Sequence, residues 1–200
     1  PYKSGMNPKS TQSPLDSLTV TARKVAEKGP PPVDQWHPAY CGEIDMRIAS
    51  DGTWFYLGTP IGRPALVKLF ASILRKDPER HVLVTPVEMV GIQVDDAPFL
   101  AVAMDIVTGE NGQSLIFRTN VDDSVTAGPD HPIRFEEEAT GGLKPYILVR
   151  GGLWAKVARP VFYDLMELGE EREINHQAMF GLTSNGAFFP MIEAEKLAAR

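Results

Sequence analysis

The chain has 200 residues, of which 20 are basic and 26 acidic, so its formal net charge is −6. Its longest unbroken apolar run, Phe99–Met104, is far shorter than the roughly 20 residues of a membrane-spanning helix. The single cysteine excludes intrachain disulfides, iron–sulfur clusters and cysteine-rich zinc sites. The first residues show no charged stretch followed by an apolar core, as a secretory leader would. We therefore expect a cytoplasmic protein that does not enter a membrane.

Residues 1–28 differ in charge from the rest of the chain. They hold five basic and two acidic residues, a formal charge of +3, whereas the remaining residues carry −9. Their apolar residues follow a partial helical stripe with Asp16 or Ser17 as the expected N-cap, and Gly29 with three prolines predicts the helix end and a stiff connector. We predict a basic segment over residues 1–32 that either packs on the body or binds a protein partner.

The next segment carries clear signals for a hairpin and a helix. Residues 43–48 alternate apolar and polar side chains, which predicts a half-buried strand. Asp51-Gly52 predicts a tight turn before a returning strand over 53–57. Pro64 can open a helix that Asp77-Pro78 ends, because apolar residues recur between them at helical spacing: Leu66, Leu69, Phe70, Ile73 and Leu74.

Three local patterns recur in the same order in the second half of the chain. Gly52-Thr53-Trp54 returns as Gly152-Leu153-Trp154, and Arg63-Pro64 returns as Arg159-Pro160. The third match joins two short apolar strings, Val90-Gly91-Ile92 and Phe180-Gly181-Leu182. Common hairpin chemistry could produce such matches by coincidence, but their shared order favours an internal duplication.

We therefore predict an α+β fold. A duplicated strand–turn–strand–helix–strand unit would give two related, mainly antiparallel β domains, each with one main helix. The expected divisions are the basic helix and connector, the first repeat domain, the second repeat domain with an inserted hairpin, and a C-terminal tail: residues 1–32, 33–97, 98–192 and 193–200.

The motifs of common catalytic and cofactor sites are missing from the sequence. It has no G-x-S-x-G, phosphate-binding loop or dinucleotide fingerprint, and its four histidines do not approach metal-ligand spacing. Cys41 follows His37 by four residues without a cysteine-hydrolase signature, so we interpret it as a small buried apolar residue. Asp95-Asp96 corresponds to Asn185-Gly186 in the third match, which favours a turn over an acid–base pair. We expect no metal, no cofactor and, because the body lacks a basic stripe with aromatic residues, no nucleic-acid polymer.

Arg63 and Arg159 are the main candidates for a binding site. Each accompanies a proline that opens a helix, where free N–H groups favour an anion and a guanidinium can grip phosphate or carboxylate. Alternatively, each arginine ties its helix to an acid on a neighbouring strand, with Asp45 the expected partner of Arg63. If the two copies pack about a pseudo-twofold axis, the cleft between them could hold both arginines. Asp45, Glu88 and Arg150 complete the set of candidate ligand-binding residues.

Several strings together resemble a bacterial family called domain of unknown function 1285. They include Cys41-Gly42-x-Ile44-Asp45 and Gly58-Thr59-Pro60-Ile61-x-Arg63 in the first half, and Val149-Arg150-Gly151-Gly152-Leu153-Trp154 in the second. The likeness covers about residues 33–192 and implies an α+β protein of two related halves. It also implies a ligand, nucleotide-like in character, between the halves in a signalling context. It implies no catalytic residue, because the family has no established activity.

These observations favour one function and leave two alternatives. The favoured hypothesis is a non-catalytic cytoplasmic binding protein that holds an anionic small ligand between its repeated domains and acts in signalling. The second is a structural or protein-interaction module that docks through a sheet edge or through residues 1–32. The third is a hydrolase that uses Asp95, Asp96 or Glu88.

Overall fold

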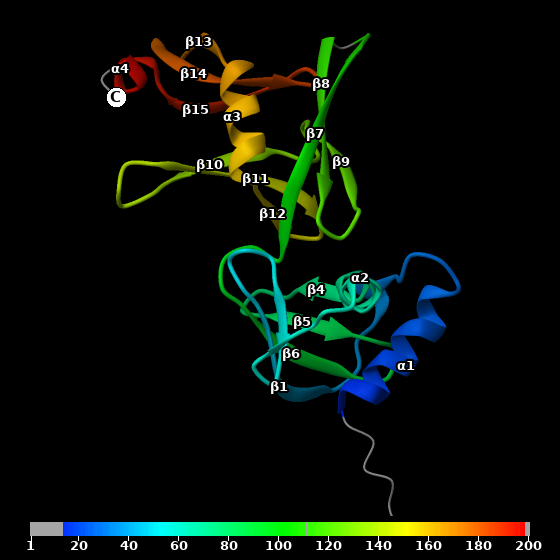
Figure 1. The fold of residues 1–200 in the computed structure, drawn as a ribbon. Helices are drawn as coiled ribbons and strands as arrows, with labels where there is room; N and C mark the ends of the chain where they lie inside the picture. Colours follow the sequence, from blue (N-terminus) through cyan, green and yellow to red (C-terminus); the bar gives the residue numbers. More distant parts are fainter. Residues whose placement is uncertain (1–13, 111, 199–200) are drawn as a thin grey trace, which may run out of the picture.

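The chain folds into two β domains that meet at residues 95–98, and the computed structural model describes residues 14–110 and 112–198 (Figure 1). The first domain is a six-stranded sheet with the order β3-β2-β1-β6-β5-β4. β1 and β6 run parallel, and the other neighbouring pairs are antiparallel. The six strands are β1 (Tyr40–Ile48), β2 (Trp54–Tyr56), β3 (Thr59–Pro60), β4 (Leu74–Lys76), β5 (His81–Val84) and β6 (Met89–Val94).

The hairpin predicted at Asp51-Gly52 is confirmed as the β1–β2 turn. Ile48 pairs with Trp54 across it, and the Thr53 N–H donates a hydrogen bond of 2.9 Å to the Asp51 carboxylate. Gly52 has a φ of +84°, which glycine adopts without steric cost. The turn therefore forms from local residues, and it delivers Trp54 to the core, where only 1% of its surface is exposed.

Helix α2 (Pro64–Ser72) begins where predicted and ends earlier. Pro64 lies in its first turn, and its buried apolar side chains are those of Phe70 and Ala71. The sequence predicted that the helix runs on to Asp77-Pro78, but Leu74 already belongs to β4. Leu74 pairs with Leu83 of β5, and both side chains are fully buried. Strand pairing between distant residues thus overrides the helical spacing.

The second domain contains two sheets and two helices. A six-stranded sheet has the order β10-β11-β12-β7-β8-β9, and a three-stranded sheet has the order β13-β14-β15. β12 and β7 run parallel. The strands of the first are β7 (Phe99–Gly109), β8 (Gly112–Thr119), β9 (Ser124–Thr126), β10 (Ile133–Glu137), β11 (Leu143–Arg150) and β12 (Leu153–Val157). Helix α3 (Arg159–Glu167) leads to β13 (Glu170–Ile174), β14 (Gln177–Ser184), β15 (Ala187–Glu193) and the short helix α4 (Ala194–Ala198).

Both domains contain the same series of elements, in agreement with the predicted α+β fold of two related, mainly antiparallel domains. A hairpin, a helix and a three-stranded meander occur in that order as β1-β2, α2 and β4-β5-β6, and again as β11-β12, α3 and β13-β14-β15. The first domain adds the short strand β3 between its hairpin and its helix. The copies differ in how the meander attaches. In the first domain β6 joins β1, whereas in the second the meander forms its own sheet and β12 pairs with β7.

The third sequence match does not join equivalent strands. Val90-Gly91-Ile92 lies in β6, the last strand of its meander, whereas Phe180-Gly181-Leu182 lies in β14, the middle strand of the other. Asn185-Gly186 turns β14 into β15, but Asp95-Asp96 connects the two domains and forms no hairpin. The comparison of these two pairs as matching turns is therefore wrong, because short apolar strings around glycine recur in unrelated strands.

Helix α1 (Pro14–Ala26) packs on the first domain. Its side chains Leu18 and Ala22 are fully buried, and the helix lies along α2. Asp16 lies in the first turn and not at the N-cap, since the helix already includes Pro14. The connector then runs through Val33–Gln35, a single 3₁₀ turn labelled η1, before β1 begins.

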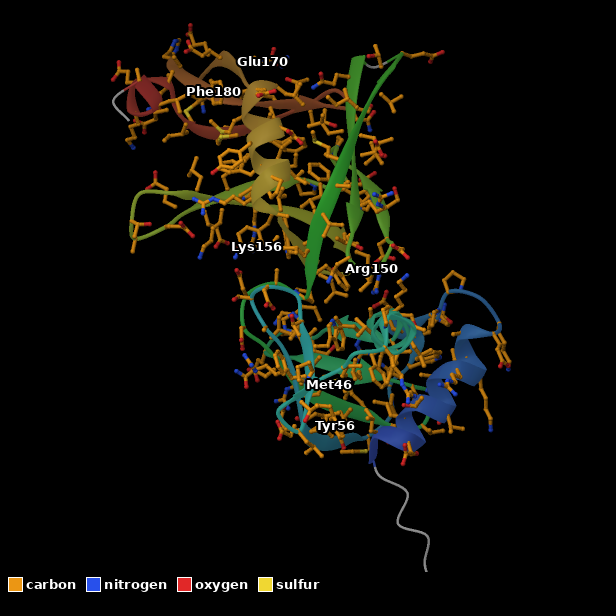
Figure 2. All side chains as sticks on the ribbon, in the orientation of Figure 1. Met46, Tyr56, Arg150, Lys156, Glu170 and Phe180 are labelled. Carbon is orange, nitrogen blue, oxygen red and sulfur yellow. The ribbon has the colours of Figure 1, made fainter. Side chains whose placement is uncertain are left out.

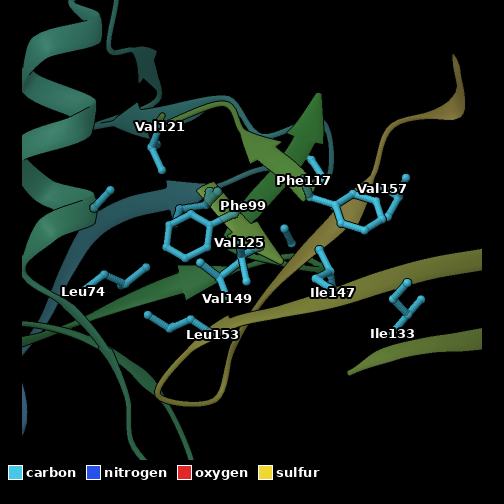
Figure 3. Packing of buried hydrophobic residues seen from close by; sticks show 14 of the residues in the cluster. Leu74, Phe99, Phe117, Val121, Val125, Ile133, Ile147, Val149, Leu153 and Val157 are labelled. Atoms are coloured by element: carbon cyan, nitrogen blue, oxygen red, sulfur yellow. The ribbon is translucent and has the colours of Figure 1, made fainter. Parts of the chain in front are cut away.

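Buried residues of both domains form one continuous core. Leu74 of the first domain belongs to the same cluster as Phe99, Val149 and Leu153 of the second (Figure 3). Leu74 and Leu153 also line a common pocket at the boundary. The domains therefore share apolar surface and are not independent units on a loose linker. No helix within the described ranges is long and apolar enough to cross a membrane.

Candidate functional site

The two arginines singled out in the sequence lie at equivalent positions but in separate pockets. Arg63 is exposed just before α2 and lines a pocket of about 200 Å³ together with Arg23 of α1. Arg159 is exposed at the start of α3 and lines a pocket of about 360 Å³. The structure thus does not bring Arg63 and Arg159 into one cleft, since each repeat places its arginine beside its own helix.

The pocket at Arg159 is rich in positive charge, and we call it the Arg159 pocket. Figure 2 shows Lys156, one of its basic residues, at the end of the second domain that faces the first. Its lining holds three basic side chains and one acidic one, with two aromatic rings beside them. The lining residues are Glu138, Gly142, Leu143, Lys144, Pro145, Lys156, Val157, Arg159, Phe162 and Tyr163.

The three basic side chains differ in how far they are engaged. Lys144 forms an ion pair of 3.3 Å with Glu138, and Lys156 forms one of 3.0 Å with Asp96. Within the described part of the chain Arg159 takes part in no ion pair. The N-cap of α3 is Ala158, which offers no side-chain cap, so the positive end of the helix dipole adds to the charge of Arg159.

Asp96 joins the Arg159 pocket to the connection between the domains. Its carboxylate accepts a hydrogen bond of 2.7 Å from the Tyr146 hydroxyl and contacts Lys156 at 3.0 Å. Partial burial alone would raise the pKa of Asp96, but the hydrogen bonds from Tyr146 and Lys156 lower the pKa below its ordinary value. Burial, followed by the bond to Asp96, raises the pKa of Tyr146. At neutral pH Asp96 is therefore a carboxylate and Tyr146 a neutral phenol.

Arg150 lies in a different pocket, of about 270 Å³, between the two domains. Its guanidinium donates hydrogen bonds to the carbonyl oxygens of Ala71 at 2.6 Å and Leu74 at 3.3 Å. Its Nε lies 3.8 Å from the Asp123 carboxylate. Burial lowers the pKa of Arg150, and Asp123 partly offsets this effect. The Arg150 guanidinium thus already interacts with carbonyl and carboxylate groups of the protein.

The second arginine of this boundary pocket is also engaged. Arg75 donates to the carbonyl oxygens of Val33 at 2.9 Å and Trp36 at 2.7 Å, and its Nε forms an ion pair of 2.7 Å with Asp77. Asp34 and Asp123 line the pocket as well, so its charges balance. The boundary pocket is accordingly a poorer place for an anion than the Arg159 pocket.

The remaining candidates, Asp45 and Glu88, lie outside the pockets described here. Asp45 is exposed on β1, and no salt bridge joins it to Arg63 among the described side chains, which removes this structural explanation for Arg63. Glu88 closes the turn between β5 and β6, where its backbone carbonyl accepts a hydrogen bond of 2.9 Å from the N–H of Thr85. Its Oε1 is buried without a hydrogen-bond partner.

The two adjacent aspartates named as alternatives for a hydrolase have different partners. Asp95 pairs with Arg47 of the first domain, whereas Asp96 contacts Tyr146 and Lys156 of the second. Among residues 14–110 and 112–198, no group of three or more His, Cys, Asp or Glu side chains is arranged to hold a metal ion.

Cys41 is exposed, so its interpretation as a buried apolar residue is wrong. It lies in the first half of β1, and only residues 46–48 of that strand pair with β2. The core therefore begins further along the strand, at Met46. The Cys41 thiol contacts the carbonyl oxygen of Ala39 at 3.5 Å.

Sequence reasoning missed Lys144, Lys156 and Tyr163. Lys144 and Tyr146 alternate on β11 and share a face of the sheet, and Lys156 pairs with Tyr146 from β12. A β-bulge between Leu148 and Arg150 sets that register. Without the bulge, a tight turn at Gly151-Gly152 would place Lys156 opposite Ile147, on the other face. The local sequence thus gave no signal that these basic residues converge.

Comparison with known protein families matches both domains of the chain. Residues 31–97 match the domain of unknown function (DUF1285), N-terminal domain, and residues 98–191 match the protein of unknown function (DUF1285), C-terminal domain. The boundary between these matches coincides with the connection that Asp96 anchors. Comparison with curated proteins gave no match.

Two solved structures resemble the chain. A DUF1285 family protein from Silicibacter pomeroyi DSS-3 is 52% identical, with a TM-score of 0.81 over 90% of this chain and 97% of that one. A DUF1285 family protein from Shewanella baltica OS155 is 30% identical, with a TM-score of 0.50 over 62% of this chain and 91% of that one. With both family domains present in order and a relative more than half identical over nearly its whole length, the chain belongs to the DUF1285 family.

Proposed function

We propose that the protein is a non-catalytic binding protein of the cytoplasm that holds an anionic small molecule in the Arg159 pocket and acts in signalling. The observation that carries the proposal is the convergence of Lys144, Lys156 and Arg159 on one pocket of about 360 Å³. A pocket of this size suits a small molecule and not a macromolecular partner. The proposed site lies in the second repeat, at its junction with the first, whereas the sequence predicted the cleft between the repeats.

Charge supports an anionic ligand. Arg159 has no ion pair within the described residues, and its guanidinium can donate two parallel hydrogen bonds to phosphate or carboxylate. Each such charge-assisted hydrogen bond contributes about 1.5–3 kcal/mol. The uncapped start of α3 favours negative charge at the same place. Lys144 and Lys156 then add positive charge from the facing strands.

The aromatic side chains of the pocket support a ligand with a planar group. Phe162 and Tyr163 follow Arg159 on α3, and Tyr163 is 58% exposed. An exposed ring beside cationic groups offers a planar or apolar part of a ligand a surface to stack on. A nucleotide combines phosphate with a planar base, so it is the ligand we would test first.

The experiment is a calorimetric and thermal-shift titration of the full chain with AMP, ATP and inorganic phosphate at constant ionic strength. A ligand at 100 times its Kd should stabilise the fold by about 2.7 kcal/mol, which raises Tm measurably. Arg159→Ala should weaken binding about tenfold or more, while Arg118→Ala should not change it. Arg118 is a suitable control because it is exposed on β8 of the same domain and lines none of the described pockets. Absence of any anion-dependent shift, or a shift that Arg159→Ala leaves intact, would contradict the proposal.

A further inference from the structure

The geometry points to a link between the Arg159 pocket and the joint of the two domains, through the single ammonium group of Lys156. We infer that an anion in the pocket competes with Asp96 for Lys156 and so loosens the connection between the domains. This inference rests on the proposed function, because it requires an anion in that pocket. Such competition would let ligand binding in the second repeat change how that repeat is connected to the first.

Lys156 belongs both to the Arg159 pocket and to the connection between the domains. It lines the Arg159 pocket from β12, and it contacts the Asp96 carboxylate at 3.0 Å. Its side chain is about one quarter exposed, so the ammonium is only partly screened by solvent. An anion bound beside Lys156 would therefore lie close to a second negative charge, that of Asp96. The two anions repel each other and divide the attraction of one cation.

Asp96 lies where a weakened contact with Lys156 would affect the connection between the domains. It directly precedes Ala97 and Pro98, between which the two family domains divide. Asp95, its neighbour, is held on the first domain by Arg47, and the Asp95 N–H bonds to the carbonyl oxygen of Ile48 at 3.0 Å. Adjacent carboxylates thus fasten the connection to one domain each.

The consequence is a reciprocal coupling between the pocket and the connection. If the ligand weakens the contact between Asp96 and Lys156, then loss of that contact must strengthen the ligand by the same factor. Tyr146 still donates to Asp96 when Lys156 turns to the ligand, which keeps the carboxylate hydrogen-bonded. The expected change is therefore a loosened connection and not an unfolded one.

The test compares Asp96→Asn with Asp95→Asn in titrations with inorganic pyrophosphate at 150 mM salt. Asp96→Asn removes the competing charge and should tighten pyrophosphate binding about tenfold, within the usual range of such couplings. Asp95→Asn removes an equal charge one residue away, from the partner of Arg47, and should leave the affinity unchanged. Equal affinities for wild type and Asp96→Asn, or equal tightening by both variants, would overturn the inference.

A second measurement needs no substitution. Hydrogen exchange of the Asp95, Asp96 and Ala97 amides in the wild-type protein should accelerate when pyrophosphate saturates the pocket. Unchanged or slower exchange at saturation would overturn the inference even if the Asp96 variant folds poorly. The two proposals fail differently: absence of Arg159-dependent pyrophosphate binding removes the proposed function, whereas binding without tightening in Asp96→Asn removes only the coupling.

Discussion

Nη2 of Arg150, at the end of β11, donates a hydrogen bond of 2.6 Å to the carbonyl oxygen of Ala71, in the last turn of α2. The last carbonyls of a helix have no partners within the helix and carry the negative end of its dipole. Arg150 therefore caps a helix of the first domain from a strand of the second. The other Nη of Arg150 donates a hydrogen bond of 3.3 Å to the carbonyl oxygen of Leu74, just beyond the helix. The contact fastens the second domain to α2 of the first.

We predict that Arg150→Met destabilises the protein by about 2–3 kcal/mol. Methionine retains an unbranched apolar side chain beside Phe99, whose ring lies 5.5 Å from the guanidinium, but it leaves the Ala71 and Leu74 carbonyl oxygens without their donors. Urea unfolding should show a lower midpoint with the same slope.

The matched control for this prediction is Arg118→Met, which should shift the midpoint by no more than about 0.5 kcal/mol because Arg118 is exposed. If both substitutions cost the same, the Arg150 contacts contribute no specific stability. Anion binding by Arg150→Met should match wild type when the protein is folded, because Arg150 does not line the Arg159 pocket.

A second prediction concerns a close backbone approach in the three-stranded sheet. A Cβ at Gly181 would lie 2.4 Å from the carbonyl oxygen of Phe189 and 3.0 Å from Cα of Pro190, both in the backbone of β15. Gly181→Ala should therefore destabilise the protein by about 2–3 kcal/mol, because strands and not a flexible side chain would have to move. Gly109→Ala is the control, since a Cβ there meets nothing within 4 Å. Thermal unfolding that gives equal Tm values for both variants would contradict this account.

Much of the fold could be predicted where local chemistry decides the structure. The Asp51-Gly52 turn and the helices that begin at Arg63-Pro64 and Arg159-Pro160 depend on neighbouring residues, and all three form where expected. The end of α2 could not be predicted in this way, because Leu74 leaves the helix to pair with Leu83, nine residues away. The false match between β6 and β14 has the same origin, since pairing across a sheet leaves no local mark.

The residues of the candidate site also divide into those that local sequence predicts and those that depend on distant contacts. Arg159 was found because a proline-initiated helix has a predictable positive end. Lys144 and Lys156 were missed because a bulge in β11 decides which face of the hairpin Lys156 occupies. Arg150 drew attention as a basic residue, but its hydrogen bonds to α2 depend on the packing of two domains. Side chains that converge through register and domain packing are therefore the part that sequence alone does not reveal.

The last prediction is a loss of stability in mild acid that depends on His81. Burial, together with the nearby positive charge of Lys76, lowers the pKa of His81 to about 4, from an ordinary value of about 6.5. As pH falls from about 6.5 to about 4, the unfolded chain binds a proton at His81 that the folded protein does not, so stability declines in that window. After allowance for solvent screening of this half-buried side chain, the decline attributable to His81 is about 1 kcal/mol. Urea midpoints between pH 4 and pH 7.5 should therefore fall less steeply in His81→Gln than in wild type, whereas His37→Gln, at an exposed position, should follow wild type. Parallel curves for wild type and His81→Gln would show that carboxylates alone cause the acid sensitivity.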